Sequence, residues 1–254
     1  MRLLVWNDGQ VIEASQLRLD RPYVMQRIHT LGHKVYNVAR HIEQLREASI
    51  SLFGFASLCG PADAERIIVK LLELSRVTPR LSCPVAMRID CDGMLSFEVE
   101  APLYDMGMSL KAKRLVGVGI SMSAFNHLYQ SSASIAIDAL TQAMASKRGG
   151  NVPIYVNSEG NIISHSWNPI FVVYNGRVYT PSAFTSVEYL VAKEAIESLG
   201  LELIVRDMPY ESLQRVDEVF FVNAMAVSSL FAVEKHRLLS VVTSRITSRM
   251  EPTV

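Results

Sequence analysis

The sequence has little cysteine and no excess of either charge. Its three cysteines, Cys59, Cys83 and Cys91, are scattered through 254 residues without CxxC spacing, which excludes a disulfide scaffold or zinc ribbon and predicts a reducing, cytoplasmic location. Lysine plus arginine and aspartate plus glutamate number 25 each. Without a basic excess, the chain is not expected to bind nucleic acid or an acidic membrane surface.

Transmembrane, secretory and standard catalytic motifs are absent as well. The sequence turns polar at Asn7 and Asp8, which is unlike a signal peptide. The longest apolar stretch, residues 219–233, is interrupted by polar residues and is shorter than the ~20 residues of a membrane span. The whole sequence contains no GxGxxG, Walker lysine loop, GxSxG, HExxH or EF-hand motif. The six histidines are scattered, so no metal site is predicted.

The sequence contains enough apolar residues to form a full hydrophobic core. Hydrophobic residues make up 49% of the chain and the mean hydropathy is +0.19, which excludes intrinsic disorder. Apolar residues at helical spacing predict helices over residues 39–53, 61–75, 132–146, 186–199 and 210–215. Alternating or short apolar runs between turn residues predict strands at 2–6, 10–13, 23–29, 34–38, 84–90, 94–100, 115–122, 152–156, 162–163, 170–174, 178–180, 201–205 and 219–222.

The order of these elements predicts an α+β fold with two domains. Strands, two helices and more strands come first, and a half with many short strands follows. Residues 102–114 are the expected connection, so the domains are predicted as 1–114 and 115–254. Strand and helix do not alternate continuously, which argues against a doubly wound sheet.

Three sequence blocks then carry a family resemblance. They are KVYNVARHIEQLREAS at 34–49, NSEGNIISHSWNPIF at 157–171 and DEVFFVNA at 217–224. In this order they resemble the class IV aminotransferases, which comprise branched-chain and D-amino-acid aminotransferases and aminodeoxychorismate lyase. The resemblance covers essentially the whole chain, and Asn223-Ala224 is most similar to the lyase branch. It implies fold type IV: a small α/β N-terminal domain, a larger pseudo-barrel C-terminal domain, a homodimer, and pyridoxal phosphate held between the domains.

The family's Schiff-base lysine aligns with Ser131. That lysine precedes a helix, some twenty residues before the block around Gly160, and no lysine lies between Arg114 and Lys147. We interpret Lys147 as a solvated residue at the end of a helix, where a positive charge complements the helix dipole. Because a serine hydroxyl cannot form an imine, the resemblance predicts no covalently bound cofactor.

Other positions of the family pattern are also changed. The acid that faces the pyridine nitrogen aligns with Ser164, and the arginine of H-x-x-R-L aligns with Gln44. The phosphate loop G-[IV]-T-R aligns with residues 186–189, which begin at Ser186 and place Glu188 where a phosphate would be repelled. The segment G-D-G-x-F-E is replaced by RPYVMQ at 21–26.

Our main interpretation is therefore a degenerate homologue that keeps the dimer and an interdomain cleft for a different small molecule. The candidate cleft residues are Gln44, Ser131, Ser132, Ser164, His165, Ser186, Asn223 and Ala224.

Two alternatives stay open. The chain could be an active pyridoxal-phosphate aminotransferase or lyase that uses a displaced lysine, Lys111 or Lys113. It could also be an interaction protein without a ligand, in which Trp167, Tyr129 and Tyr189 fill the cleft, since an empty cavity costs stability.

Overall fold

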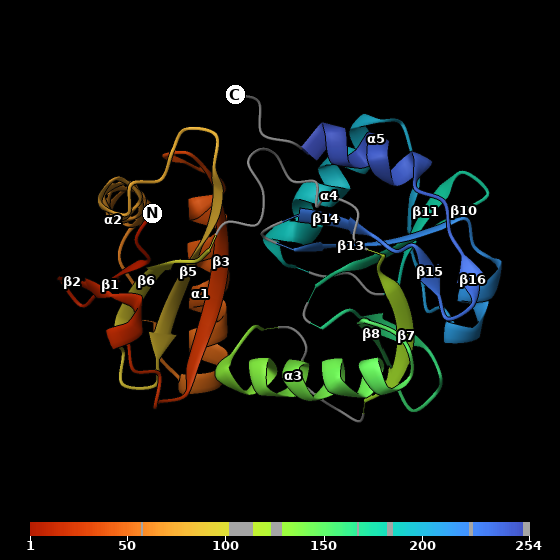
Figure 1. The fold of residues 1–254 in the computed structure, drawn as a ribbon, viewed down its shortest axis with the longest axis horizontal. Helices are drawn as coiled ribbons and strands as arrows, with labels where there is room; N and C mark the ends of the chain where they lie inside the picture. Colours follow the sequence, from red (N-terminus) through yellow and green to blue (C-terminus); the bar gives the residue numbers. More distant parts are fainter. Residues whose placement is uncertain are drawn as a thin grey trace. The chain divides into compact units, whose positions relative to one another are not determined.

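The computed structural model describes residues 1–56, 58–101, 114–122, 129–166, 168–181, 185–223 and 226–250 (Figure 1). By the density of internal contacts the chain divides into two units. Unit 1 contains the described residues up to 101 together with Tyr129–Ala133, and unit 2 contains the other described residues. The three cysteines are free. Within the described ranges, no helix is long and apolar enough to cross a membrane.

Unit 1 is built on a six-stranded antiparallel sheet with the order β2-β1-β6-β5-β3-β4. The first hairpin turns at Asp8 and Gly9, both at positive φ, as Asp-Gly turns favour. A short 3-10 helix, η1 (Ala14–Gln16), follows the hairpin. The strands are β1 (Leu4–Asn7), β2 (Gln10–Glu13), β3 (Tyr23–Leu31), β4 (Lys34–Val35), β5 (Ser82–Asp90) and β6 (Leu95–Val99).

Two amphipathic helices, α1 (Val38–Phe53) and α2 (Pro61–Leu74), share one core with this sheet. Gly54 ends α1 in the left-handed region at φ 79°, which glycine adopts readily because it has no Cβ. The strand predicted at 34–38 is wrong in its second half, because it ends at Val35 and Asn37 turns into the left-handed region before α1 begins.

Unit 2 contains two five-stranded sheets, ordered β12-β11-β10-β13-β14 and β16-β15-β7-β8-β9. The second is mixed, since β7 pairs in parallel with both β8 and β15. The strands are β7 (Val116–Ser121), β8 (Val152–Val156), β9 (Ile162–Ser164), β10 (Ile170–Tyr174), β11 (Arg177–Thr180), β12 (Leu203–Val205), β13 (Glu218–Asn223), β14 (Ala226–Ser229), β15 (Ala232–Val233) and β16 (His236–Arg237).

Two hydrophobic cores lie on opposite faces of the first of these sheets. On β10, Phe171 and Val173 belong to the core shared with α4 (Val187–Ser198) and α5 (Val241–Met250), and both helices lie beside β13 and β14 in Figure 1. Ile170 and Val172 belong to the other core, which includes residues of both sheets. The remaining helices are α3 (Ser132–Lys147) and the 3-10 helix η2 (Tyr210–Arg215).

The glycines after α3 have two different roles. A glycine pair after a helix predicts a helix end at positive φ, and Gly149 adopts φ 80°. Gly150 does not: a Cβ there would lie 2.1 Å from Cγ2 of Val118 and 2.9 Å from the carbonyl oxygen of Val116. Glycine is needed at 150 because the chain passes β7 too closely for any side chain.

Candidate functional site

A buried arginine lies on the face of the unit 1 sheet that is turned away from the helices. The register pairs Arg88 with Met25 on β3 and with Ser96 on β6. Because strand side chains alternate between faces, these residues point away from the core that contains Val24 and Met87. Arg88 is 6% exposed, so its guanidinium must find partners within the protein or in a ligand.

Acidic residues hold one side of this guanidinium. The Nη2 atom of Arg88 lies 2.6 Å from Oε2 of Glu98 and 3.8 Å from Oε1 of Glu100. Glu100 is shared with Arg27, whose Nε lies 2.9 Å from Oε2. The Tyr23 ring covers the guanidinium, with its centroid 5.8 Å from Cζ. The arginine is thus fixed in position by two carboxylates and an aromatic ring.

Three nitrogens at this face have no partner among the described residues. They are Nε and Nη1 of Arg88 and Nε2 of Gln130. Gln130 is 5% exposed, and its backbone carbonyl oxygen accepts a hydrogen bond from the backbone N–H of Met25, the residue opposite Arg88. A buried N–H without an acceptor costs about 1–3 kcal/mol, so this arrangement can gain stability by binding an anion.

Ser131 and Ser132 lie at the edge of the same sheet. Ser131 forms an isolated antiparallel bridge with Val24, and the Oγ of Ser132 accepts a hydrogen bond from the backbone N–H of Tyr23 at 3.3 Å. Because bridge partners share a face and Val24 is in the core, the bridge directs Ser131 toward the helix-covered face. Gln130 then takes the face of Arg88.

Gln44 lies half-buried on α1 of unit 1. One turn earlier, His41 is buried, with its Nδ1 atom 3.0 Å from Oε1 of Gln26. Burial, followed by the charge of His29, lowers the pKa of His41 to about 3. This histidine is therefore neutral at physiological pH and adds no positive charge that could replace the family's arginine.

Ser164 and His165 lie in unit 2 at the end of β9. Ser164 is fully buried and donates a hydrogen bond to the carbonyl oxygen of Ser166. The His165 ring lies against Phe221, with centroids 4.2 Å apart, and its Nδ1 is 2.7 Å from the carbonyl oxygen of Pro153. Burial lowers the pKa of His165 to about 4, although the Pro153 contact opposes the shift. Both side chains thus have internal partners.

Asp138 of α3 brings a carboxylate to this segment. Its Oδ1 atom accepts hydrogen bonds from the Ser166 hydroxyl and from the Tyr155 hydroxyl, the latter at 2.6 Å. The Oγ1 of Thr141 lies 3.0 Å from the Tyr155 hydroxyl. Burial and the adjacent Asp138 raise the pKa of Tyr155 to about 12. The carboxylate oxygen is occupied by hydroxyls of the protein, so the cluster acts as an internal anchor between α3, β8 and the segment after β9.

The remaining predicted residues are placed as follows. Ser186 caps α4, where its side chain accepts a hydrogen bond from the backbone N–H of Tyr189 at 3.2 Å. Asn223 is half-buried as the last residue of β13. Tyr129 packs against the unit 1 core, and Tyr189 stacks on Phe171 in a unit 2 core. The predicted positions Ala224, Lys111, Lys113 and Trp167 lie outside the described residues.

No lysine in the described ranges is buried. Lys34, Lys70, Lys147 and Lys235 are exposed, and Lys193 is half-buried beside Glu197. The exposed state of Lys147 agrees with the solvated helix end expected for it. The described residues also contain no cluster of histidine, cysteine, aspartate and glutamate that could hold a metal ion.

The sequence interpretation missed Arg88, Gln130 and Asp138. One signal was available for Arg88, since it is the only charged residue within PVAMRI, a run otherwise typical of a buried strand. No local pattern marks Gln130 or Asp138, because their surroundings come from residues far away in the sequence.

The comparisons with known proteins agree with this fold. The sequence matches the family model "Amino-transferase class IV" over residues 24–229. No curated protein sequence matches it significantly.

Solved structures match over nearly the full chain. A branched-chain aminotransferase from the archaeon Thermoproteus uzoniensis, with norvaline, has a TM-score of 0.80 and is 18% identical, covering 98% of this chain and 94% of that one. The branched-chain aminotransferase from Escherichia coli gives 0.78 and 15%, with coverage of 97% and 92%. An aminotransferase from Brucella abortus bound to PLP gives 0.81 and 14%, with coverage of 98% of each chain. These identities support the fold alone, and they confirm the predicted two-domain α+β architecture of fold type IV.

Proposed function

Because the chain belongs to the class IV aminotransferase family, we propose that it keeps the fold but does not hold pyridoxal phosphate as a lysine imine. In its place it binds a small anionic molecule. The observation that carries the proposal is the serine at position 131, where the family pattern has the lysine. The resemblance to aminodeoxychorismate lyase and the branched-chain enzymes then describes ancestry and fold rather than activity.

The residues at the aligned positions do not fit the cofactor. An imine needs an amine, preferably one with a pKa lowered by its surroundings, and the described lysines are exposed or half-buried. The acid position holds Ser164, which is buried and hydrogen-bonded to Ser166, and a serine cannot keep a pyridine nitrogen protonated. Gln44 carries no charge for a phosphate. No catalytic step through pyridoxal phosphate is therefore derived.

The ligand class follows from the nitrogens that lack an acceptor in the described part of the chain. Arg88 and Gln130 supply three buried N–H-bearing nitrogens, and carboxylate oxygens are strong acceptors for such groups. Glu98 and Glu100 hold the guanidinium from the other side, so it is oriented before the ligand binds. We therefore assign to this face of unit 1 the binding of a small carboxylate.

Borohydride trapping tests the absence of a lysine imine. The full chain is incubated with excess pyridoxal phosphate, reduced with borohydride, and analysed by intact mass and peptide mapping. We expect only substoichiometric labelling of exposed lysines, at the same level in a Ser131→Ala control. A stoichiometric adduct on one lysine, together with visible absorbance that reduction abolishes, would overturn the proposal. An adduct at Lys111 or Lys113 would favour the active-enzyme alternative.

We also propose that the protein is a homodimer, as the family resemblance implies. The outer side of α3 supports this, because Leu140 and Met144, one turn apart, are 62% and 39% exposed. Ile137, one turn before Leu140 on the same side of the helix, is half-buried. Such an apolar stripe is typical of a surface that is covered in an assembly. The cytoplasmic location stays a prediction from the cysteine content.

A further inference from the structure

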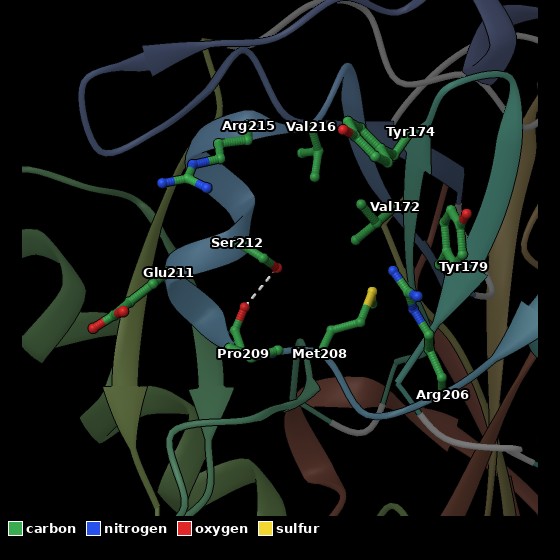
Figure 2. A pocket seen from close by; sticks show the side chains of 10 residues that line it. All are labelled: Val172, Tyr174, Tyr179, Arg206, Met208, Pro209, Glu211, Ser212, Arg215 and Val216. Carbon is green, nitrogen blue, oxygen red and sulfur yellow. Dashed lines mark hydrogen bonds between the residues drawn. The ribbon is translucent and has the colours of Figure 1, made fainter.

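Unit 2 contains a pocket of about 390 Å³ beside η2 (Figure 2), a volume within the range of small-molecule sites. One wall comes from the hairpin of β10 and β11. Val172 lies opposite Tyr179 in this hairpin, and Tyr174 follows Val172 by two residues. Because side chains alternate along a strand, all three point to the same face and line the pocket together.

Apolar and aromatic side chains line one part of the pocket. Met208 and Val216 complete it from the segments before and after η2, and both are buried. Figure 2 shows Met208 pointing into the space and the Tyr174 ring reaching across one side of it. Ser212 also points inward, and its hydroxyl donates to the carbonyl oxygen of Pro209 at 2.6 Å, which leaves the oxygen free to accept a hydrogen bond.

One cation is turned toward this interior. Arg206 follows β12, and its backbone N–H donates to the carbonyl oxygen of Thr180. Its guanidinium lies over the Tyr179 ring, with Cζ 4.4 Å from the centroid. A guanidinium stacked in this way keeps its N–H groups in the plane, where they can donate to an anion. Arg206 makes no ion pair with any carboxylate among the described residues.

The other charged residues at the rim point away. In Figure 2 the side chains of Glu211 and Arg215 extend outward from η2, although both residues line the rim of the pocket. Among the described residues, the charge that lies beside the aromatic wall is the positive charge of Arg206. An inorganic anion would gain contacts from the cation alone and would lose hydration beside the apolar walls, whereas a flat apolar acid would match both the walls and the cation.

We propose that the pocket beside η2 is a binding site for an aromatic carboxylate, with the ring between Val172, Met208 and Val216 and the carboxylate on Arg206. All of its lining residues belong to unit 2. The proposal does not depend on Ser131 or Arg88, so either assignment can fail without the other.

The test is calorimetric titration of the full chain with 2-naphthoate and with its uncharged counterpart, 2-naphthamide. For naphthoate we expect saturable binding with a Kd of about 0.1–1 mM. The amide should bind about tenfold more weakly, because it cannot form the charge-assisted hydrogen bonds to the guanidinium. Equal affinities for the two compounds, or no saturable naphthoate binding, would refute the site.

Three variants locate the binding. Arg206→Gln should weaken naphthoate binding about tenfold and bring it to the level of the amide. Arg245→Gln is the matched control, because Arg245 is exposed on α5, whose core lies on the opposite face of the sheet, and it should change the affinity by less than about threefold. Ser212→Phe should block both compounds by filling the space. Thermal unfolding of each variant verifies folding, and naphthoate binding unaffected by both Arg206→Gln and Ser212→Phe would place the ligand elsewhere.

Discussion

Replacing Arg88 by methionine tests whether this buried arginine is both an anchor of the sheet and an anion site. Its side chain is 7% exposed and Glu98, its nearest ion-pair partner, is 20% exposed. Removing one partner of a buried pair costs about 3–5 kcal/mol, because the remaining charge is uncompensated. The partial exposure of Glu98 reduces this penalty, and Glu100 keeps Arg27 at 2.9 Å. We expect the free energy of unfolding to fall by about 3 kcal/mol, measured by urea denaturation.

A second substitution separates the lost charge from lost contacts. In the double variant Arg88→Met with Glu98→Gln, the uncompensated carboxylate is gone, so about 1–2 kcal/mol should return. Arg2→Met is the control, since the side chain of Arg2, which pairs with Glu13, is 66% exposed. This substitution should lower the free energy of unfolding by less than about 1 kcal/mol.

The same unfolding curves report anion binding when sodium acetate replaces sodium chloride at constant ionic strength. Binding to the folded state adds about 1.4 kcal/mol when the ligand is at ten times its Kd. Acetate should stabilise the wild type, and it should stabilise Gln130→Met and the Arg88/Glu98 double variant less. Equal stabilisation of all three proteins would refute the assignment to Arg88 and Gln130. No stabilisation of any would favour the ligand-free interaction protein.

Three further predictions concern stability and assembly. Glu218 is 2% exposed and accepts two hydrogen bonds at the start of α5, from the backbone N–H and the hydroxyl of Thr243. Glu218→Gln should lower the free energy of unfolding by about 2 kcal/mol in urea denaturation, and no loss would refute this cap. Burial lowers the pKa of His41 in the folded protein to about 3 from its ordinary value of 6.5. Protonation of His41 therefore favours the unfolded chain, so the unfolding free energy is highest above pH 6.5 and falls as the pH drops toward 3. Between pH 7 and 5 the wild type should lose about 2 kcal/mol more than His41→Asn in unfolding free energy, and parallel pH profiles would contradict this. Leu140→Glu should convert the proposed dimer to a monomer in light scattering while Ser146→Glu leaves it unchanged; an unaltered Leu140→Glu dimer would show that α3 is not the interface.

Much of the fold was predictable because its signals are local. The apolar periodicity of α1 and α2 predicted both helices to within about a residue at each end. Asp8-Gly9 predicted the first hairpin, because its positive φ angles are costly for most other residues. Strands β14 to β16 and helix α5 escaped prediction, since the strands are only two to four residues long and α5 contains few apolar residues.

The same distinction between local sequence signals and tertiary contacts applies to the site residues. Alignment of the sequence blocks predicts that Ser131, Ser164 and Gln44 stand at positions where the family pattern has catalytic or cofactor-binding residues. It could not show that Ser131 pairs with Val24, nor that Ser164 is occupied by a hydrogen bond to Ser166. Those facts depend on strand pairing and loop conformation rather than on residue type.

The sequence by itself predicted the family and the order of elements, because both are signalled by neighbouring residues, and the absence of a lysine at the aligned position stays a prediction. Only the tertiary structure decided that Arg88 is buried with N–H groups that no described residue accepts, that Gly150 must pass close to Val118, and that Arg206 stacks on Tyr179. Each of these depends on strand register and on contacts between segments that are far apart in the sequence. Burial and the presence of a partner are properties of the folded neighbourhood, and no local pattern in the chain encodes them.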